Sequence, residues 1–379
     1  MSIPISMGYS QIAGLPAVYG LYCSILPVLI YGFVTSSPQF VFGVDATPAA
    51  LVGGTLATLG IVSGSEEAKA VVPAITLVAA LWLLLFCFIK AGRIVNYIST
   101  PVMGGFISGI GVTIILMQAA KLFGGNAGTG EAIQLVMHIA GEFDSFNLLS
   151  AVLGVGTVVI ILVAKKFIPK FPMSVLLMVL GALATAIFHI DRFGVKLLPH
   201  VDKGLPGFSL PDMSVVLKNP SEIILLGLSV AGVVMAQTLL ATNNYANKYG
   251  YKVSNNREIL AYAAANAASA VIGGCPLNGS VSRTGIADQF GCKSQFMSIT
   301  ASLTMLLIVL FGTPVLEYLP VPILTGIVVA ALIGITEFGL AVKLWKTDHT
   351  EFAIFVGAFL GVLLFGTIYG VVILSLIHI

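Results

Sequence analysis

The chain has 379 residues, of which 58% are hydrophobic and 9% are charged, and its formal net charge is only +2. Because soluble domains carry roughly 25% charged residues, this composition excludes an ordinary soluble enzyme or nucleic-acid-binding domain and indicates a membrane protein. With about 20 residues for each spanning helix, the length allows roughly 12 to 14 crossings.

Apolar runs follow one another along the whole chain. After a partial run at 3–12, they span residues 17–35, 44–61, 70–90, 100–121, 147–167, 173–190, 222–246, 258–273, 280–290, 295–312, 322–342, 351–366 and 367–379. Two of them, 44–61 and 280–290, are short and adjoin glycine and proline. Counted from the N-terminus they are the third and the tenth, so each is the third member of a set of seven. Short, interrupted segments at corresponding positions of two halves indicate the binding site of a transporter.

The first short run is preceded by the sequence FVFGVDATPAA, residues 40–50. Its β-branched and aromatic residues predict a short extended segment, followed by a helix that begins near Asp45. Pro48 falls in the first turn, where proline is tolerated. Three roles are open for Asp45: it caps the helix, pairs with Arg283, or titrates as a proton- or cation-coupling group.

The second short run follows GGCPLNGSVSR, residues 273–283, which sets polar residues and one arginine inside an apolar region. Each unsatisfied backbone amide in hydrocarbon costs roughly several kcal/mol. A helix that is interrupted there must therefore line a protein cavity. An arginine within the membrane is a functional-site hypothesis, with an anion as its partner. The alternative is a tight loop between two helices, but a surface loop does not need such apolar flanks.

Two helices that begin in mid-membrane point their N-termini at each other. Each N-terminus carries free N–H groups and roughly half a positive charge, so the pair forms an anion site. In the first half we expect the N–H groups of Ala46 and Thr47 to contribute. The predicted substrate-binding residues of the second half are Asn278, Gly279, Ser280, Ser282 and Arg283.

Polar residues also occur in the run at 222–246. Gln237 lies where it could complete the substrate site, and Thr238 beside it is, with Asp45, a candidate for binding a coupling ion. The alternative is that polar side chains on this run hold helices together.

Most of the 18 lysines and arginines fall in loops on the side at which the first run begins. The positive-inside rule therefore predicts a multi-pass protein of the cell membrane with both termini in the cytoplasm. The histidines and cysteines have no metal-ligand spacing, and the sequence contains no P-loop or nucleophile motif. We therefore expect no enzyme, no metal and no cofactor beyond a coupling proton or sodium ion, and no nucleic-acid partner.

Three motifs resemble the SulP sulfate permease family, which includes prestin and pendrin. IPISMGYSQIAGLPAVYGLY at 3–22 resembles the family's opening signature, and ISTPVMGGFISGIG at 98–111 resembles its fifth helix. Residues 250–283, which end in the Ser-Arg pair, are similar to its eighth to tenth helices. The resemblance covers essentially the whole chain.

The resemblance implies an all-α polytopic fold of about 13–14 helices in a seven-plus-seven inverted repeat, with helices 3 and 10 short and preceded by extended segments. A core subdomain of about 1–95 and 222–312 would move against a gate subdomain of about 97–215 and 318–379. Residues 1–379 would then be a single transport domain, an elevator-type transporter that assembles as a homodimer in the bilayer.

The sequence departs from the family pattern in four places. It begins at Met1 within the family's first motif, and it stops at Ile379 without the STAS domain that usually follows, so we expect a fragment of a longer protein. Gln237 stands where many bacterial members have Glu, and GVDATPAA replaces a commoner GP-x-A entry to the third helix. These last two departures leave the coupling ion and the substrate open.

The leading hypothesis is a secondary active transporter of small anions of the sulfate, bicarbonate or dicarboxylate class. Two alternatives stand beside it. One is a nucleobase-type proton symporter of the same fold, and the other is a non-transporting membrane protein that senses anions.

Overall fold

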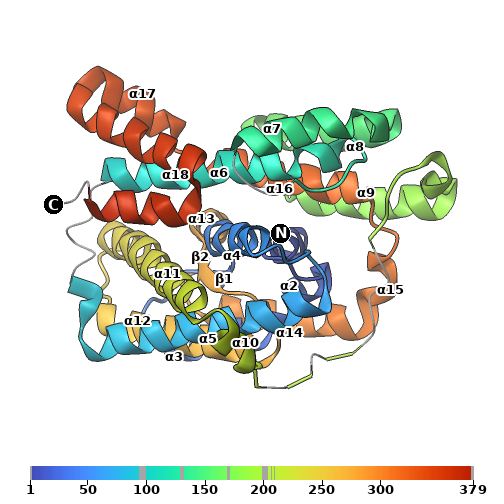
Figure 1. Cartoon of the computed structure of the whole chain (residues 1–379). Helices are drawn as coiled ribbons and strands as arrows, with labels where there is room; N and C mark the ends of the chain where they lie inside the picture. The colour runs from blue at the N-terminus through green and yellow to red at the C-terminus, as the bar shows by residue number, and fades with distance from the viewer. Residues whose placement is uncertain are drawn as a thin grey trace.

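The computed structural model describes residues 2–93, 100–128, 132–168, 171–198, 204–205, 207–208 and 210–376. The described chain is almost entirely helical. Figure 1 shows the helices in two groups, one above and one below a central region that holds two short strands and two short helices. These central elements come from the two regions that the sequence singles out.

The lower group in Figure 1 and the central elements are formed by two separate stretches of sequence. The first stretch contains α1 (Ser2–Ile12), α2 (Ala17–Tyr22), α3 (Leu26–Val34), β1 (Phe42–Val44), α4 (Ala46–Thr58) and α5 (Glu66–Phe88). The second contains α10 (Ser214–Lys218), α11 (Pro220–Tyr249), α12 (Asn255–Val271), β2 (Leu277–Gly279), α13 (Val281–Gln289), α14 (Phe296–Leu307), a π-helical turn (Ile308–Gly312) and α15 (Thr313–Leu316). The long helix α5 packs against both α11 and α12.

The upper group comes from the other two stretches. It contains α6 (Thr100–Leu122), α7 (Ala132–Gly141), a 3-10 turn (Glu142–Ser145), α8 (Leu148–Phe167), α9 (Met173–Phe188), a second 3-10 turn (Ile190–Phe193), α16 (Val321–Ile335), α17 (Phe338–Thr347) and α18 (His349–Leu376). Here α6 packs against α16 and α18, and α8 packs against α16.

Six helical segments of the described chain are long and apolar enough to span a membrane. They are Ala17–Val34, Glu66–Phe88, Pro101–Leu122, Leu148–Phe167, Pro220–Tyr249 and Val321–Thr347. Local signals set where some of them begin. Ser65 accepts a hydrogen bond from the N–H of Ala68 at the start of α5, and Asn147 accepts one from Ser150 at the start of α8. Such caps satisfy N–H groups that the helix itself leaves free.

Glycine permits close contacts between helices around the central region. A Cβ atom added to Gly53 on α4 would lie 2.0 Å from the carbonyl oxygen of Ile12, at the end of α1. One added to Gly8 on α1 would lie 2.1 Å from Val328 Cγ2 on α16. Small residues at these points let helices approach to backbone contact, and they fix α4 directly against α1.

The predicted elements are confirmed in their main features, with two corrections. The runs at 351–366 and 367–379 form one continuous helix, α18, as far as Leu376, and residues 377–379 lie outside the described part of the chain. The amphipathic helices α7 and α17 were not predicted as separate elements, because their mixed polarity hides them in a search for apolar runs. The short runs at 44–61 and 280–290 appear as the central helices α4 and α13.

Candidate functional site

The two halves of the chain meet in a two-stranded antiparallel sheet. In β1 and β2, Phe42 pairs with Gly279, Gly43 with Asn278 and Val44 with Leu277. Each strand ends where a short helix begins, α4 after β1 and α13 after β2. The sheet satisfies backbone groups that would otherwise be unpaired deep in an apolar protein, and it holds the N-termini of both helices at one place.

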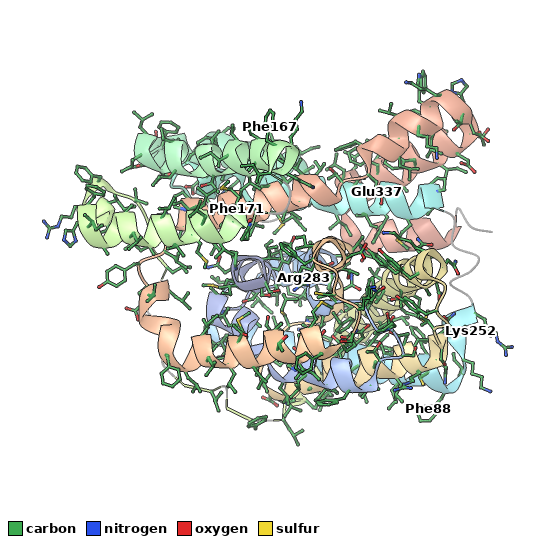
Figure 2. All side chains as sticks on the ribbon, turned by 180° about the vertical axis from the view of Figure 1, so that it is seen from behind. Phe88, Phe167, Phe171, Lys252, Arg283 and Glu337 are labelled. Carbon is green, nitrogen blue, oxygen red and sulfur yellow. The ribbon has the colours of Figure 1, made fainter. Side chains whose placement is uncertain are left out.

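Arg283 lies in the first turn of α13 and reaches across the sheet to β1. Its side chain is 7% exposed, and Nη2 donates a 2.6 Å hydrogen bond to the carbonyl oxygen of Val44. Figure 2 shows Arg283 in the centre of the molecule, between the two groups of helices. Gly43 provides the space, since a Cβ atom there would lie 3.0 Å from Arg283 Nη1. The guanidinium therefore joins the two halves of the site.

Two buried polar atoms of this region have no protein partner. They are Nε of Arg283 and Oγ1 of Thr47, and each belongs to the first turn of one central helix. Buried polar atoms are nearly always hydrogen-bonded, so each exception needs an explanation. Among the described residues Arg283 also forms no ion pair with a carboxylate. The guanidinium and two helix N-termini, each carrying roughly half a positive charge, therefore form an electropositive centre with unused donors.

Asn278 connects α11 to both strands. The N–H of Gly279 donates to Thr238 Oγ1 at 3.0 Å, and the Thr238 hydroxyl donates to Asn278 Oδ1 at 2.6 Å. Asn278 Nδ2 donates to Gln237 Oε1 at 2.6 Å and to Asp45 Oδ2 at 3.4 Å. Five of the predicted residues, Asp45, Gln237, Thr238, Asn278 and Gly279, thus form one network centred on Asn278.

The structure does not show two of the three roles predicted for Asp45. Asp45 occupies the N-cap position of α4 with an extended backbone, but its side chain forms no capping hydrogen bond. It also forms no ion pair with Arg283, although the two charges are close enough to interact electrostatically. The capping and direct pairing roles are therefore not observed, and the coupling role stays a prediction.

The remaining predicted residues lie around this network. Ala46 and Thr47 begin α4, and Gly279 ends β2, packed between Phe40 and Thr238. Ser280 is the N-cap residue of α13, and its N–H donates to the carbonyl oxygen of Val41 at 2.9 Å. Ser282 lies in the first turn of α13, but its side chain is outside what the structure describes.

Two residues of the site were missed by sequence reasoning. Thr284 Oγ1 accepts a hydrogen bond from the N–H of Val41 at 3.0 Å and donates to the carbonyl oxygen of Ser280 at 2.7 Å. Tyr9 on α1 is buried close enough to interact electrostatically with both Asp45 and Arg283. Thr284 follows the Ser-Arg pair directly and could have been suspected, whereas no sequence signal places Tyr9 here.

A cavity of about 330 Å³ reaches the guanidinium. Arg283, Val41 and Phe42 form one part of its wall, and the rest comes from mostly apolar residues of α3, α13 and α14. Its volume is typical of a small-molecule site, about 300–1,000 Å³. Among the described residues, neither α4 nor the network around Asn278 contributes to this lining, so the cavity meets Arg283 from the side of α3 and α14 and not from between the two helix N-termini.

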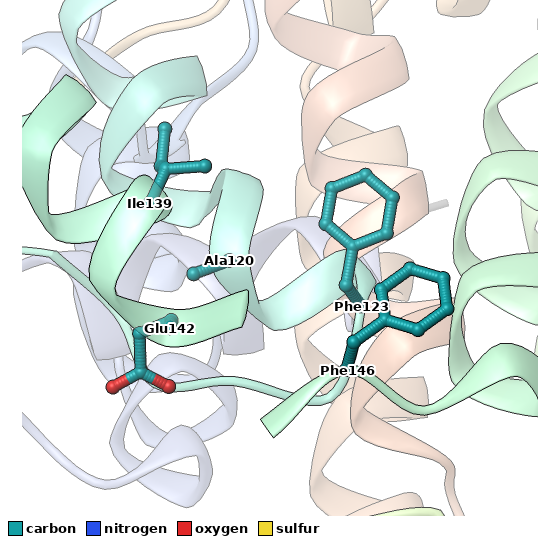
Figure 3. Close-up of a pocket in the computed structure, with 5 residues that line it drawn as sticks. All are labelled: Ala120, Phe123, Ile139, Glu142 and Phe146. Carbon is teal, nitrogen blue, oxygen red and sulfur yellow. The ribbon is translucent and has the colours of Figure 1, made fainter. Parts of the chain in front are cut away.

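A second, smaller cavity of about 80 Å³ lies in the upper group of helices (Figure 3). Its lining consists of Ala120, Phe123, Ile139, Glu142 and Phe146. Hydrogen bonds from the Ser145 hydroxyl and the Asn126 backbone N–H hold the pKa of Glu142 below its usual value. The cavity thus carries a carboxylate and no cationic side chain, which disfavours an anion. No metal-ligand cluster of His, Cys, Asp or Glu occurs among the described residues.

A sequence profile of the sulfate permease family matches residues 1–358. The chain belongs to the sulfate permease family. Among its curated relatives, low affinity sulfate transporter 3 of Stylosanthes hamata is 29% identical over 96% of this chain and 59% of that protein. A probable sulfate transporter of Mycobacterium tuberculosis is 26% identical over 97% of this chain and 65% of that protein. This sulfate permease family chain thus spans less than two thirds of those relatives, which are named as transporters and not as enzymes.

Solved structures share the fold of this sulfate permease family chain. The murine solute carrier 26 family member A9 anion transporter, in its inward-facing state, is 21% identical with a TM-score of 0.89, covering 99% of this chain and 66% of that chain. The transmembrane domain of the cyanobacterial bicarbonate transporter BicA is 18% identical with a TM-score of 0.85, covering 98% of this chain and 94% of that domain. The predicted polytopic all-α membrane fold is confirmed.

Proposed function

We propose that the protein is a secondary active transporter of small anions, of the sulfate, bicarbonate or dicarboxylate class. The observation that carries this proposal is the buried Arg283 guanidinium, which has an unpartnered Nε, no ion pair among the described residues and a cavity at its side. A buried charge without an ion-pair partner is costly, and an anion bound between the N-termini of α4 and α13 would neutralise it. Membership of the sulfate permease family supports the same conclusion.

Transport would require the site to open to each side of the membrane in turn. We propose that the lower group of helices, with β1, β2, α4 and α13, moves as the core against the upper group as the gate. Contacts between the two groups run mainly from α1 to α16 and from α4 to α6 and α18. The sheet, by contrast, binds both halves of the site to each other, which supports movement of the site as one unit. Assembly as a homodimer in the cell membrane, with both termini in the cytoplasm, is part of the proposal.

Uptake into liposomes tests the proposed function. We expect reconstituted protein to take up at least one of radiolabelled sulfate, bicarbonate and succinate in a saturable manner, and to show no uptake of uracil. Gradients of protons and of sodium, imposed separately, identify the driving ion. Folded protein that takes up none of the three anions would overturn the proposal.

We further propose that Asp45 carries the coupling proton. Its carboxylate and the substrate compete for the same electropositive centre, with Arg283 on α13 and Tyr9 on α1 as its ionisable neighbours. Protonation of Asp45 removes a negative charge beside the anion, so it strengthens anion binding, and a bound anion in turn favours the protonated form. This reciprocal effect is the requirement for symport.

Replacing Asp45 by asparagine isolates this role, because asparagine is nearly the same size and cannot be ionised. We expect anion uptake by Asp45→Asn protein to continue but to lose its response to an inward proton gradient. Uptake is measured with and without the gradient, and Asp191→Asn, in a loop outside the site, serves as control. A proton response that persists in Asp45→Asn protein contradicts the assignment.

A further inference from the structure

A second carboxylate, besides that of Asp45, is buried in the same group of helices and has no part in the network described above. Glu258, in the first turn of α12, is 0% exposed. Among the described residues no lysine or arginine forms an ion pair with it. A buried carboxylate without a cationic partner must be stabilised by hydrogen bonds alone.

Those hydrogen bonds come from three short stretches of the chain. Oε1 accepts from the Ser36 N–H at 2.6 Å, from the Ser36 hydroxyl at 2.7 Å, and from the Thr35 hydroxyl and the Ser37 N–H at 2.8 and 3.0 Å. Oε2 accepts from Thr35 Oγ1 at 3.0 Å and from the phenol hydroxyls of Tyr31 and Tyr262, at 3.3 and 3.4 Å. One carboxylate therefore fixes the end of α3, the segment after it and a tyrosine on α12.

The two tyrosine rings pack against a residue of the site and also stack on each other, with ring centroids 6.2 Å apart. Phe42 of β1 stacks on Tyr31 with ring centroids 4.7 Å apart and on Tyr262 with centroids 5.2 Å apart. The interplanar angles are 19° and 6°, so the three rings are close to parallel. All three side chains are at most 1% exposed. We call Glu258, Tyr31, Tyr262 and Phe42 the tyrosine clamp.

The tyrosine clamp acts on the part of β1 that forms the site. Phe42 pairs with Gly279 across the sheet, directly before Ser280 and the start of α13. Two residues after Phe42, the carbonyl oxygen of Val44 accepts the hydrogen bond from Arg283. A displacement of Phe42 therefore moves the acceptor that orients the guanidinium.

The segment between α3 and β1 is also held by a second side chain. Gln295 Nε2 donates to the carbonyl oxygens of Ser37 and Phe40, both at 2.8 Å. Glu258 and Gln295 together fix the backbone that leads into β1. The remaining freedom of β1 lies in the packing of Phe42 against the two tyrosine rings.

We propose that Glu258 is a positioning residue for the anion site. Its carboxylate holds the hydroxyls of Tyr31 and Tyr262, their rings hold Phe42, and Phe42 holds β1 so that the Val44 carbonyl oxygen orients Arg283. The inference rests on the proposed function, because it assumes that Arg283 binds the transported anion. Glu258 itself does not touch the anion.

The test separates positioning from simple packing by removing only the two hydroxyls. In the double variant Tyr31→Phe/Tyr262→Phe the rings remain, but their connection to Glu258 is lost. We expect the KM for the transported member of the sulfate, bicarbonate and succinate panel to rise roughly tenfold, which corresponds to about 1.4 kcal/mol. The maximal rate per folded protein should stay close to that of the wild type. Tyr318→Phe, at a half-exposed tyrosine far from the clamp, is the matched control.

A second comparison uses the order of the proposed connections. Phe42→Leu, which removes the stacked ring, should raise KM by a similar factor. Combined with the double tyrosine variant it should add little, because both changes interrupt the same series of contacts from Glu258 to β1. An unchanged KM in the tyrosine variant, or fully additive effects, would overturn the tyrosine clamp while leaving the proposed function intact. Absence of anion uptake by the wild-type protein would overturn the proposed function itself, and the clamp with it.

Discussion

Replacing Arg283 by alanine is expected to abolish anion uptake at substrate concentrations that saturate the wild-type protein. Removing one partner of a buried, hydrogen-bonded charge pair costs about 2–5 kcal/mol of binding energy. Arg283→Lys should retain part of the affinity, because it keeps the charge but cannot hold the Val44 carbonyl oxygen and an anion in one planar fork. Uptake and anion-dependent thermal stabilisation of purified protein both measure the effect.

Stabilisation by added anion distinguishes binding from folding at this position. Arg283 donates to the Val44 carbonyl oxygen and interacts electrostatically with Asp45, so its removal should lower thermal stability even without anion, and the further rise in unfolding temperature on adding anion should be lost. Arg192→Ala, at an exposed position in a loop, is the control for loss of a positive charge and should transport normally. Wild-type affinity in folded Arg283→Ala protein would contradict the proposed anion site.

Replacing Gly53 by alanine is expected to destabilise the protein strongly, with a much lower unfolding temperature and little uptake. The new Cβ atom would lie 2.0 Å from the Ile12 carbonyl oxygen. This is a backbone atom, so no side-chain rotation can relieve the clash. Overpacking in a dense interior costs roughly 1–3 kcal/mol and sometimes more. Here the cost falls on the contact that places α4, and thus one of the two helix N-termini, against α1.

Gly156→Ala provides the matched control for this substitution. Gly156 lies within helix α8, and an added Cβ atom there meets no atom within 4 Å. Because alanine favours helix over glycine by roughly 0.5–1 kcal/mol, this variant should be as stable as the wild type or slightly more so. An unfolding temperature for Gly53→Ala equal to that of Gly156→Ala would show that α1 and α4 do not approach each other as described.

The sequence predicts the fold more completely than it predicts the site. Apolar runs, and the interruption of two of them by glycine, proline and polar residues, are local properties, so the short helices and their extended lead-in segments could be found directly. The pairing of Asn278 with Gln237, Thr238 and Asp45 depends on side-chain orientation across three elements. No spacing rule encodes it.

Asp45 and Arg283 illustrate where the prediction stops. Their opposite charges suggest a direct pair, but Arg283 donates instead to the backbone carbonyl of Val44. Backbone acceptors are invisible in a sequence, because every residue has one. Backbone donors are equally invisible, so the hydrogen bonds from the N–H groups of Ser36 and Ser37 to Glu258 could not be foreseen.

The antiparallel pairing of β1 with β2 has a consequence for the assembly of the protein during synthesis. Asp45, beside β1, and its partner Asn278 in β2 are separated by 233 residues. The N–H and carbonyl groups of β1 therefore stay without their β2 partners until residues 277–279 have been made. Within a bilayer, water cannot substitute for those partners. The first half must be inserted with an incomplete centre, sheltered by the translocation machinery or by neighbouring helices. Closure of the sheet is then a late, non-local event of the kind that slows folding, and a ribosome stalled before residue 277 would leave a membrane-inserted intermediate without an anion site.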